Sequence, residues 1–147
     1  MIIINYYQYQ YIFNTLYDLA LVLSIKSTMS IKLYELYHQK DIKGLIDFSK
    51  NDLSEVIDNI EQLYKDFKYQ WMLENKSFGF EVQSYRFGGL VQRLKDVRSE
   101  IDDYINHHND KIEALEVRIL NLANEDDPYL GCIYYNQFAK YVTFGTF

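Results

Sequence analysis

The sequence predicts an all-α protein, a bundle of about five helices followed by an aromatic C-terminal tail, in one domain spanning residues 1–147. Two observations carry this prediction. Residues that end regular structure are scarce, with six glycines and a single proline, Pro128, in 147 residues. Apolar residues also recur at steps of three and four, which places them on one face of an α-helix.

The first half of the chain is predicted to hold three helices. A long helix is expected over residues 9–38, with a broad apolar face and a serine-rich middle that permits a bend at residues 26–30. A short helix should follow over residues 42–48. The spacing of Asp52 and Glu55 matches a capping box, which predicts the start of a third helix that runs to about residue 71.

A loop rich in aromatic and charged residues is predicted to interrupt the helical pattern between residues 75 and 89. Gly79 permits backbone angles closed to other residues, and Phe78 and Phe80 flank it as large apolar side chains. Two interpretations stay open. Either the loop folds back and buries both phenylalanines in the core, or it presents them to a partner.

The same segment offers candidates for polar recognition. The glycine pair at 88–89 is expected to stand at the start of a fourth helix, where free amide groups can bind an anion or a carbonyl group. Arg86 is a candidate ion-pair partner of Glu74 or Glu81, because a guanidinium group matches a carboxylate.

Two further helices and a tail are predicted after this loop. The fourth helix is expected over residues 90–105. After a polar turn, Asp110 and Glu113 form a second capping box that predicts a fifth helix to about residue 122. The tail of residues 123–147 is rich in tyrosine and phenylalanine, and its segment 141–144 is expected to be a short strand or a docking arm.

Composition excludes several classes of function. The net charge is −6 and no cluster of basic residues appears, so nucleic acid is not an expected partner. The single cysteine, Cys132, excludes an internal disulfide and a thiolate zinc site. The longest apolar run, residues 19–23, is too short to span a membrane, and the N-terminus lacks the pattern of a signal peptide. A cytoplasmic protein without a membrane partner is therefore expected.

Catalytic and metal-binding patterns are weak. The sequence contains no G-x-S-x-G, P-loop or H-E-x-x-H motif. His107 and His108 lie in an expected turn, and adjacent helical side chains point about 100° apart, so they are interpreted as turn residues. The acidic run at residues 125–127 is interpreted as a solvated turn. No catalytic residue, metal or cofactor is predicted.

The segment from Trp71 to Leu90 reads W-x-x-E-N-K-x-F-G-F-E-V-x-x-x-R-x-G-G-L. It resembles the C-terminal helical domain of a bacterial subgroup of family 20 glycoside hydrolases, the exo-acting β-N-acetylhexosaminidases. The resemblance extends over about residues 6–122, and Ser77 stands where the family pattern has proline. In that family a (β/α) barrel holds the active site. A barrel of that kind needs about 250 residues, so the resemblance implies a domain without its own catalytic part.

What the resemblance implies is a non-catalytic domain that docks on the barrel of a parent enzyme, contributes to a homodimer and supports the active site. N-acetylhexosamine-containing glycans are further candidate partners. This hypothesis predicts an exposed apolar patch around Phe78 and Phe80. The alternative is an independent helical module that binds a protein or a carbohydrate through its tyrosines. The residues expected to form the interface are Trp71, Glu74, Asn75, Lys76, Phe78, Gly79, Phe80, Glu81, Arg86, Gly88 and Gly89.

Overall fold

Every regular element that the structure describes is a helix, which confirms the all-α prediction. The computed structural model describes residues 6–116, and no strand occurs among them. The chain divides into a unit of residues 1–112 and a unit of residues 113–147. The elements are η1 (Tyr6–Tyr9), α1 (Gln10–His38), α2 (Ile42–Asp47), the π-helical turn η2 (Phe48–Asp52), α3 (Leu53–Glu74), α4 (Phe80–Ile105) and, in the second unit, α5 (Glu113–Glu116).

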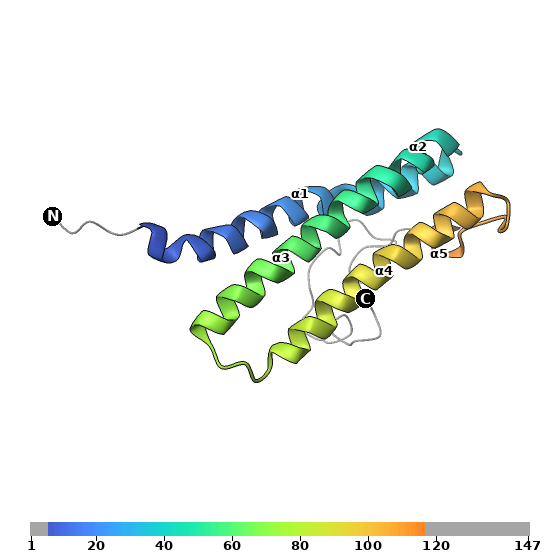
Figure 1. The fold of residues 1–147 in the computed structure, drawn as a ribbon. Coiled ribbons are helices and arrows are strands. Elements are labelled where there is room, and N and C mark those ends of the chain that lie inside the picture. Colours follow the sequence, from blue (N-terminus) through green and yellow to red (C-terminus); the bar gives the residue numbers. More distant parts are fainter. Residues whose placement is uncertain (1–5, 117–147) are drawn as a thin grey trace, which may run out of the picture. The chain divides into compact units, whose positions relative to one another are not determined.

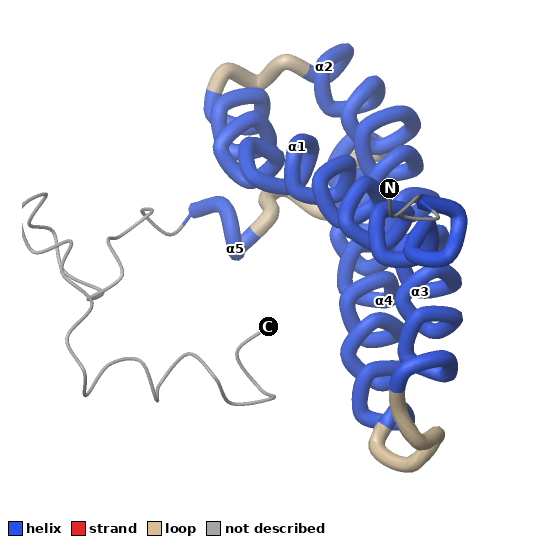
Figure 2. The backbone as a smooth tube through the Cα atoms, turned by 90° about the vertical axis from the view of Figure 1, so that its left-hand side faces the viewer, coloured by secondary structure: helices blue, strands red, loops and turns tan. Residues whose placement is uncertain are grey.

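Helix α3 is the central element of the first unit, because it packs against both α1 and α4 (Figure 1). The tube view in Figure 2 shows α3 and α4 joined by their loop as a helical hairpin. The most deeply buried side chains come from α2, η2, the first half of α3 and the last part of α4. Burying one such side chain stabilises the fold by about 1.5–3 kcal/mol. The deeply buried side chains are those of Leu45, Phe48, Leu53, Val56, Ile60 and Ile101.

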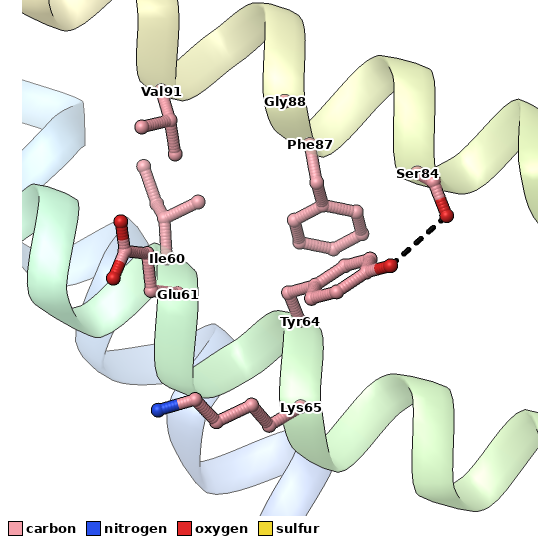
Figure 3. A pocket seen from close by; sticks show the side chains of 8 residues that line it. All are labelled: Ile60, Glu61, Tyr64, Lys65, Ser84, Phe87, Gly88 and Val91. Atoms are coloured by element: carbon pink, nitrogen blue, oxygen red, sulfur yellow. Dashed lines mark hydrogen bonds between the residues drawn. The ribbon is translucent and has the colours of Figure 1, made fainter.

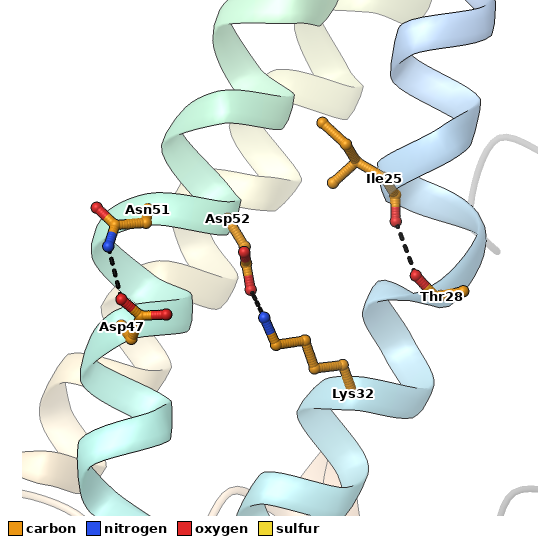
Figure 4. Close-up of polar contacts among 6 residues, drawn as sticks. All are labelled: Ile25, Thr28, Lys32, Asp47, Asn51 and Asp52. Carbon is orange, nitrogen blue, oxygen red and sulfur yellow. Dashed lines mark hydrogen bonds and ion pairs between the residues drawn. The ribbon is translucent and has the colours of Figure 1, made fainter.

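The long first helix has nearly the predicted bounds. The predicted capping box at Asp52, in contrast, is wrong. Asp52 has helical backbone angles (φ −60°, ψ −46°) and caps nothing. The π-helical turn keeps the chain helical from α2 into α3, and the N–H of Leu53 donates to the carbonyl of Phe48. No free amide is left for a cap, and Asp52 instead forms an ion pair with Lys32 of α1 (Figure 4).

The polar turn after α4 lies where the sequence predicts it. His107 takes a left-handed backbone conformation (φ 59°), and the helix ends there. The second capping box is also wrong, since α5 begins at Glu113 and Asp110 lies too far before it. The buried hydroxyl of Tyr37 accepts a hydrogen bond from the N–H of Ile112 (3.3 Å), which holds the end of this unit to α1. Residues 117–147, including Cys132 and segment 141–144, lie outside the described part of the chain.

A buried carboxyl group, that of Asp18, lies between α1 and α3. Asp18 is only 7% exposed, and its Oδ2 atom has no hydrogen-bond partner among the described residues. Burial raises the pKa of Asp18, and the hydrogen bond and charge of the neighbouring Asp66 raise it further. The folded state therefore holds a proton that the unfolded state releases. Stability should fall as pH rises from about 4 through the raised pKa, and should stay lower above it.

Replacing Asp18 by asparagine is expected to raise the free energy of unfolding by about 1 kcal/mol at pH 7, because the neutral amide removes the cost of burying a titratable carboxyl group beside Asp66. At pH 4 the difference from the natural chain should shrink, since the raised pKa favours the neutral form of Asp18 in the folded state as the pH falls. Urea denaturation at both pH values measures this. Asp58→Asn on the exposed side of α3 is the matched control. An equal effect of Asp18→Asn at both pH values would contradict the prediction.

Candidate functional site

The candidate interface centres on the loop of residues 75–79, which joins α3 to α4. This loop is much shorter than predicted, because α4 begins at Phe80 and not at Leu90. Gly79 caps the helix with φ 91°, an angle that only glycine adopts at low cost, so the chain reverses within five residues. The glycine pair at 88–89 thus lies inside α4. The prediction that its amides are free at a helix start is wrong.

The shape of this loop is fixed by its own polar groups. The indole N–H of Trp71 donates to the carbonyl of Lys76 (2.9 Å). The N–H of Asn75 donates to the carbonyl of Trp71 (2.8 Å), which closes α3. The carboxylate of Glu81 accepts from the N–H of Gly79 (2.8 Å), which places a negative charge at the start of α4. Hydrogen bonds within the hairpin therefore brace both ends of the loop.

The predicted pairing of Arg86 with a carboxylate is absent among the described residues. Glu81 accepts from the loop backbone, and Glu74 accepts a hydrogen bond from the hydroxyl of Tyr11 on α1 (2.9 Å). That hydrogen bond raises the pKa of Tyr11 and connects the end of α3 to the start of α1. Arg86 remains exposed on α4.

The two phenylalanines beside Gly79 differ in burial. Phe80 is 4% exposed, and its ring lies 5.7 Å from the ring of Trp71 and 6.1 Å from that of Phe67. Phe78 is 87% exposed. The prediction of a patch around both residues is therefore correct for Phe78 and wrong for Phe80, which the aromatic cluster draws into the core.

Phe78 precedes two exposed apolar side chains on the outer side of α4. Val82 is 41% exposed and Tyr85 is 67% exposed. Val82 and Tyr85 are three residues apart in α4, which places them on the side opposite the one that Phe80 presents to α3, and Phe78 lies in the loop just before the helix. We call Phe78, Val82 and Tyr85 the α4 strip. Its last two members were not predicted, although the spacing would have revealed them had α4 been started at Phe80.

The glycine pair at 88–89 follows this strip. A Cβ atom added at Gly88 or at Gly89 would meet no atom within 4 Å. Glycine inside a helix costs about 1 kcal/mol relative to alanine. Packing among the described residues therefore gives no reason for glycine at either position, and both positions leave the helix backbone open to close approach from outside.

A shallow hollow of about 440 Å³ lies between α3 and α4 (Figure 3). The hydroxyl groups of Tyr64 and Ser84 are 3.0 Å apart at its edge, and the ring of Phe87 lies 5.4 Å from that of Tyr64. The two aromatic rings that line the hollow pack against each other. The lining residues are Ile60, Glu61, Tyr64, Lys65, Ser84, Phe87, Gly88 and Val91.

Metal and membrane sites are not found in residues 6–116. Within that range no three histidine, cysteine, aspartate or glutamate side chains gather as metal ligands would. His108 instead lies 3.3 Å from a carboxylate oxygen of Asp103 at the exposed end of α4. None of the described helices combines the length and apolar character needed to cross a bilayer.

These features define a class of protein: an all-α helical domain that presents a preformed apolar surface beside a helix–helix loop. The chain matches the model of the Glycoside Hydrolase 20C C-terminal domain over residues 3–132, and it belongs to this family. This confirms the resemblance that the loop sequence indicates. Comparison with individual curated proteins found no significant match.

Proposed function

We propose that this chain is the non-catalytic C-terminal domain of a family 20 β-N-acetylhexosaminidase-like enzyme. In this proposal it docks on the catalytic barrel, takes part in dimer assembly and supports the active site. The single observation that carries the proposal is the exposure of Phe78, whose side chain is 87% accessible on a loop braced from within. The family match supports the same assignment.

Preorganisation of the loop should favour docking. A large aromatic side chain held in place before binding loses little conformational freedom when a partner covers it. The loop bonds of Trp71 and Glu81 already fix the backbone on both sides of Phe78. Tyr85 of α4 adds a second exposed ring, with a hydroxyl group available for a rim contact. Exposed aromatic side chains such as Phe78 and Tyr85 are enriched in protein–protein interfaces.

The test uses the catalytic barrel of a 20C-type glycoside hydrolase in three forms: with its own C-terminal domain, without it, and with this chain in its place. The readouts are the melting temperature of the barrel and hydrolysis of a chromogenic N-acetyl-β-glucosaminide. We expect the barrel alone to lose stability and activity, and this chain to restore both at least in part. Phe78→Ser with Tyr85→Ser should remove most of the restoration.

The matched control is Tyr69→Ser, which removes a similarly exposed ring (59%) from α3, where it lies edge-on to Tyr11 of α1. No restoration by the natural chain would overturn the proposal. The alternative, an independent binding module, would need a ligand site of its own, and the hollow at Tyr64 and Phe87 is the place to look for one. Saturable binding of N-acetylglucosamine oligomers by the chain alone, lost in Phe87→Ala, would favour that alternative.

A further inference from the structure

The first half of α1, residues 10–23, has few deeply buried apolar side chains with which to pack on α3. Its buried side chains are those of Thr15, Asp18 and Val22, and only the last is apolar. The deepest part of the core comes instead from α2, η2, α3 and α4. Segments with little buried apolar surface open at a lower free energy than the rest of a fold. The attachment of this half to α3 therefore depends on polar groups as well.

Those polar groups include a pair of carboxyl groups on the two facing helices. Asp18 of α1 is 7% exposed and lies within hydrogen-bond reach of Asp66 of α3. Asp66 is held in turn by Gln62 one turn earlier in α3, whose Nε2 donates to its Oδ2 (3.2 Å). Two carboxyl groups can form a hydrogen bond only when one of them is protonated, because a carboxylate has no donor. This contact between α1 and α3 therefore contains a proton.

The other charged groups on the elements around α1 do not offset a second negative charge in this pair. Helix α1 packs against α3, α2, η1 and η2. On α3, Glu74 accepts a hydrogen bond from Tyr11, two turns before Asp18. Element η1 has no charged residue, and α2 and η2 follow the far end of α1. The charged residues of α2 and η2 are Lys43, Asp47, Lys50 and Asp52.

Loss of the proton would place two negative charges against each other in a buried interface. Burial and the carboxyl group of Asp66 both raise the pKa of Asp18, and no cation among the described residues lowers it. Separation of α1 from α3 would return both carboxylates to water and relieve the repulsion. Protonation of the pair and closure of the interface are therefore coupled.

We propose that Asp18 and Asp66 form a pH-dependent latch, which holds the first half of α1 on α3 while the pair shares a proton and releases it more often when both groups are ionised. This inference is independent of the proposed function. In the open form Asp18 returns to its ordinary pKa of 3.8, so the closed form binds the proton more tightly. The open fraction should rise as the pH increases from about 4 through the raised pKa of Asp18, and level off above it.

Thiol labelling with dithiodipyridine measures this opening in the full chain. Cys132→Ser removes the natural thiol, and Thr15→Cys places a reporter one turn from Asp18, at a position that is 9% exposed. Ser24→Cys, at an exposed position of α1, gives the reactivity of a free thiol at each pH. From pH 4.5 to pH 7.5 we expect the labelling rate of Thr15→Cys, relative to that of Ser24→Cys, to rise about fivefold or more.

Substitutions of the pair separate the shared proton from other effects of pH. Asp18→Asn should remove the rise, because no group of the pair then needs to be protonated. In Asp66→Asn the amide can donate to the ionised carboxylate of Asp18, so labelling at pH 7.5 should stay within about twofold of its value at pH 4.5. Asp58→Asn removes an exposed charge of α3 outside the pair and should keep the full rise. Circular dichroism at both pH values confirms that each variant folds.

A reporter in the core separates local opening from global unfolding. Val56→Cys lies at a position that is 0% exposed, and only global unfolding should expose it. Thr15→Cys should therefore react about tenfold faster or more. Equal rates for these two reporters would overturn the latch, and so would a Thr15→Cys rate that does not rise with pH or that rises equally in Asp66→Asn. If a substitution of the pair prevents folding, the pH dependence of Thr15→Cys against both reference thiols decides.

Discussion

Replacing Phe80 by alanine is expected to lower the free energy of unfolding by about 3–5 kcal/mol. Its ring is 4% exposed and packs among the rings of Tyr64, Phe67 and Trp71, at centroid distances of 5.8, 6.1 and 5.7 Å. Alanine would leave a cavity where the loop is anchored, and the three rings cannot all move to fill it. Urea or thermal denaturation followed by circular dichroism measures the loss.

Phe78→Ala is the matched control, because it removes the same side chain two residues away. Phe78 is 87% exposed, so its replacement should change stability by no more than about 0.5 kcal/mol. In the barrel-linked protein, Phe78→Ala should weaken docking on the barrel while the domain remains folded. Equal losses of stability in the two variants would contradict the burial of Phe80 and the exposure of Phe78.

Helix periodicity made most of this fold predictable. The long apolar repeat of residues 9–38 is satisfied by a helix of nearly the same extent, α1 (Gln10–His38). The errors lie where a local motif competed with a longer-range contact. Asp52 has the sequence of a cap, but a π-helical turn removes the free amides and Lys32 of α1 takes the carboxylate. Local spacing does not reveal a turn that depends on packing between helices.

The position of the loop that joins α3 to α4 was predictable, but its length and the burial of its residues were not. Phe78 lies in the loop between two helices as predicted, but Phe80, which the prediction also placed in that loop, is the first residue of α4. Sequence alone gave Phe78 and Phe80 the same character, because both are phenylalanines beside one glycine. Their different burial follows from the point at which α4 begins, since one residue precedes the helix and the other enters it on the side that faces α3. Because α4 was predicted to begin at Leu90, neither this difference in burial nor the exposure of Tyr85 could be predicted.

Replacing Gly88 and Gly89 by alanine is expected to raise the free energy of unfolding by about 1 kcal/mol each, or about 2 kcal/mol together. Both lie inside α4, and an added Cβ meets no atom within 4 Å at either position. Gly44→Ala is the contrasting control and should destabilise by about 1–3 kcal/mol. There an added Cβ would lie 2.5 Å from Cδ2 of Leu36 and 2.6 Å from a carboxylate oxygen of Asp41.

A gain in stability from both glycine variants would show that the domain accepts a less stable helix than its sequence could provide. Such a cost is consistent with a surface that must let another backbone approach closely, next to the ring of Tyr85. The joined protein then gives the deciding measurement. If Gly88→Ala and Gly89→Ala stabilise the free chain but reduce the restoration of barrel stability, the glycine pair lies in the docking surface. If restoration is unchanged, the pair lies outside that surface, and docking relies on Phe78, Val82 and Tyr85 alone.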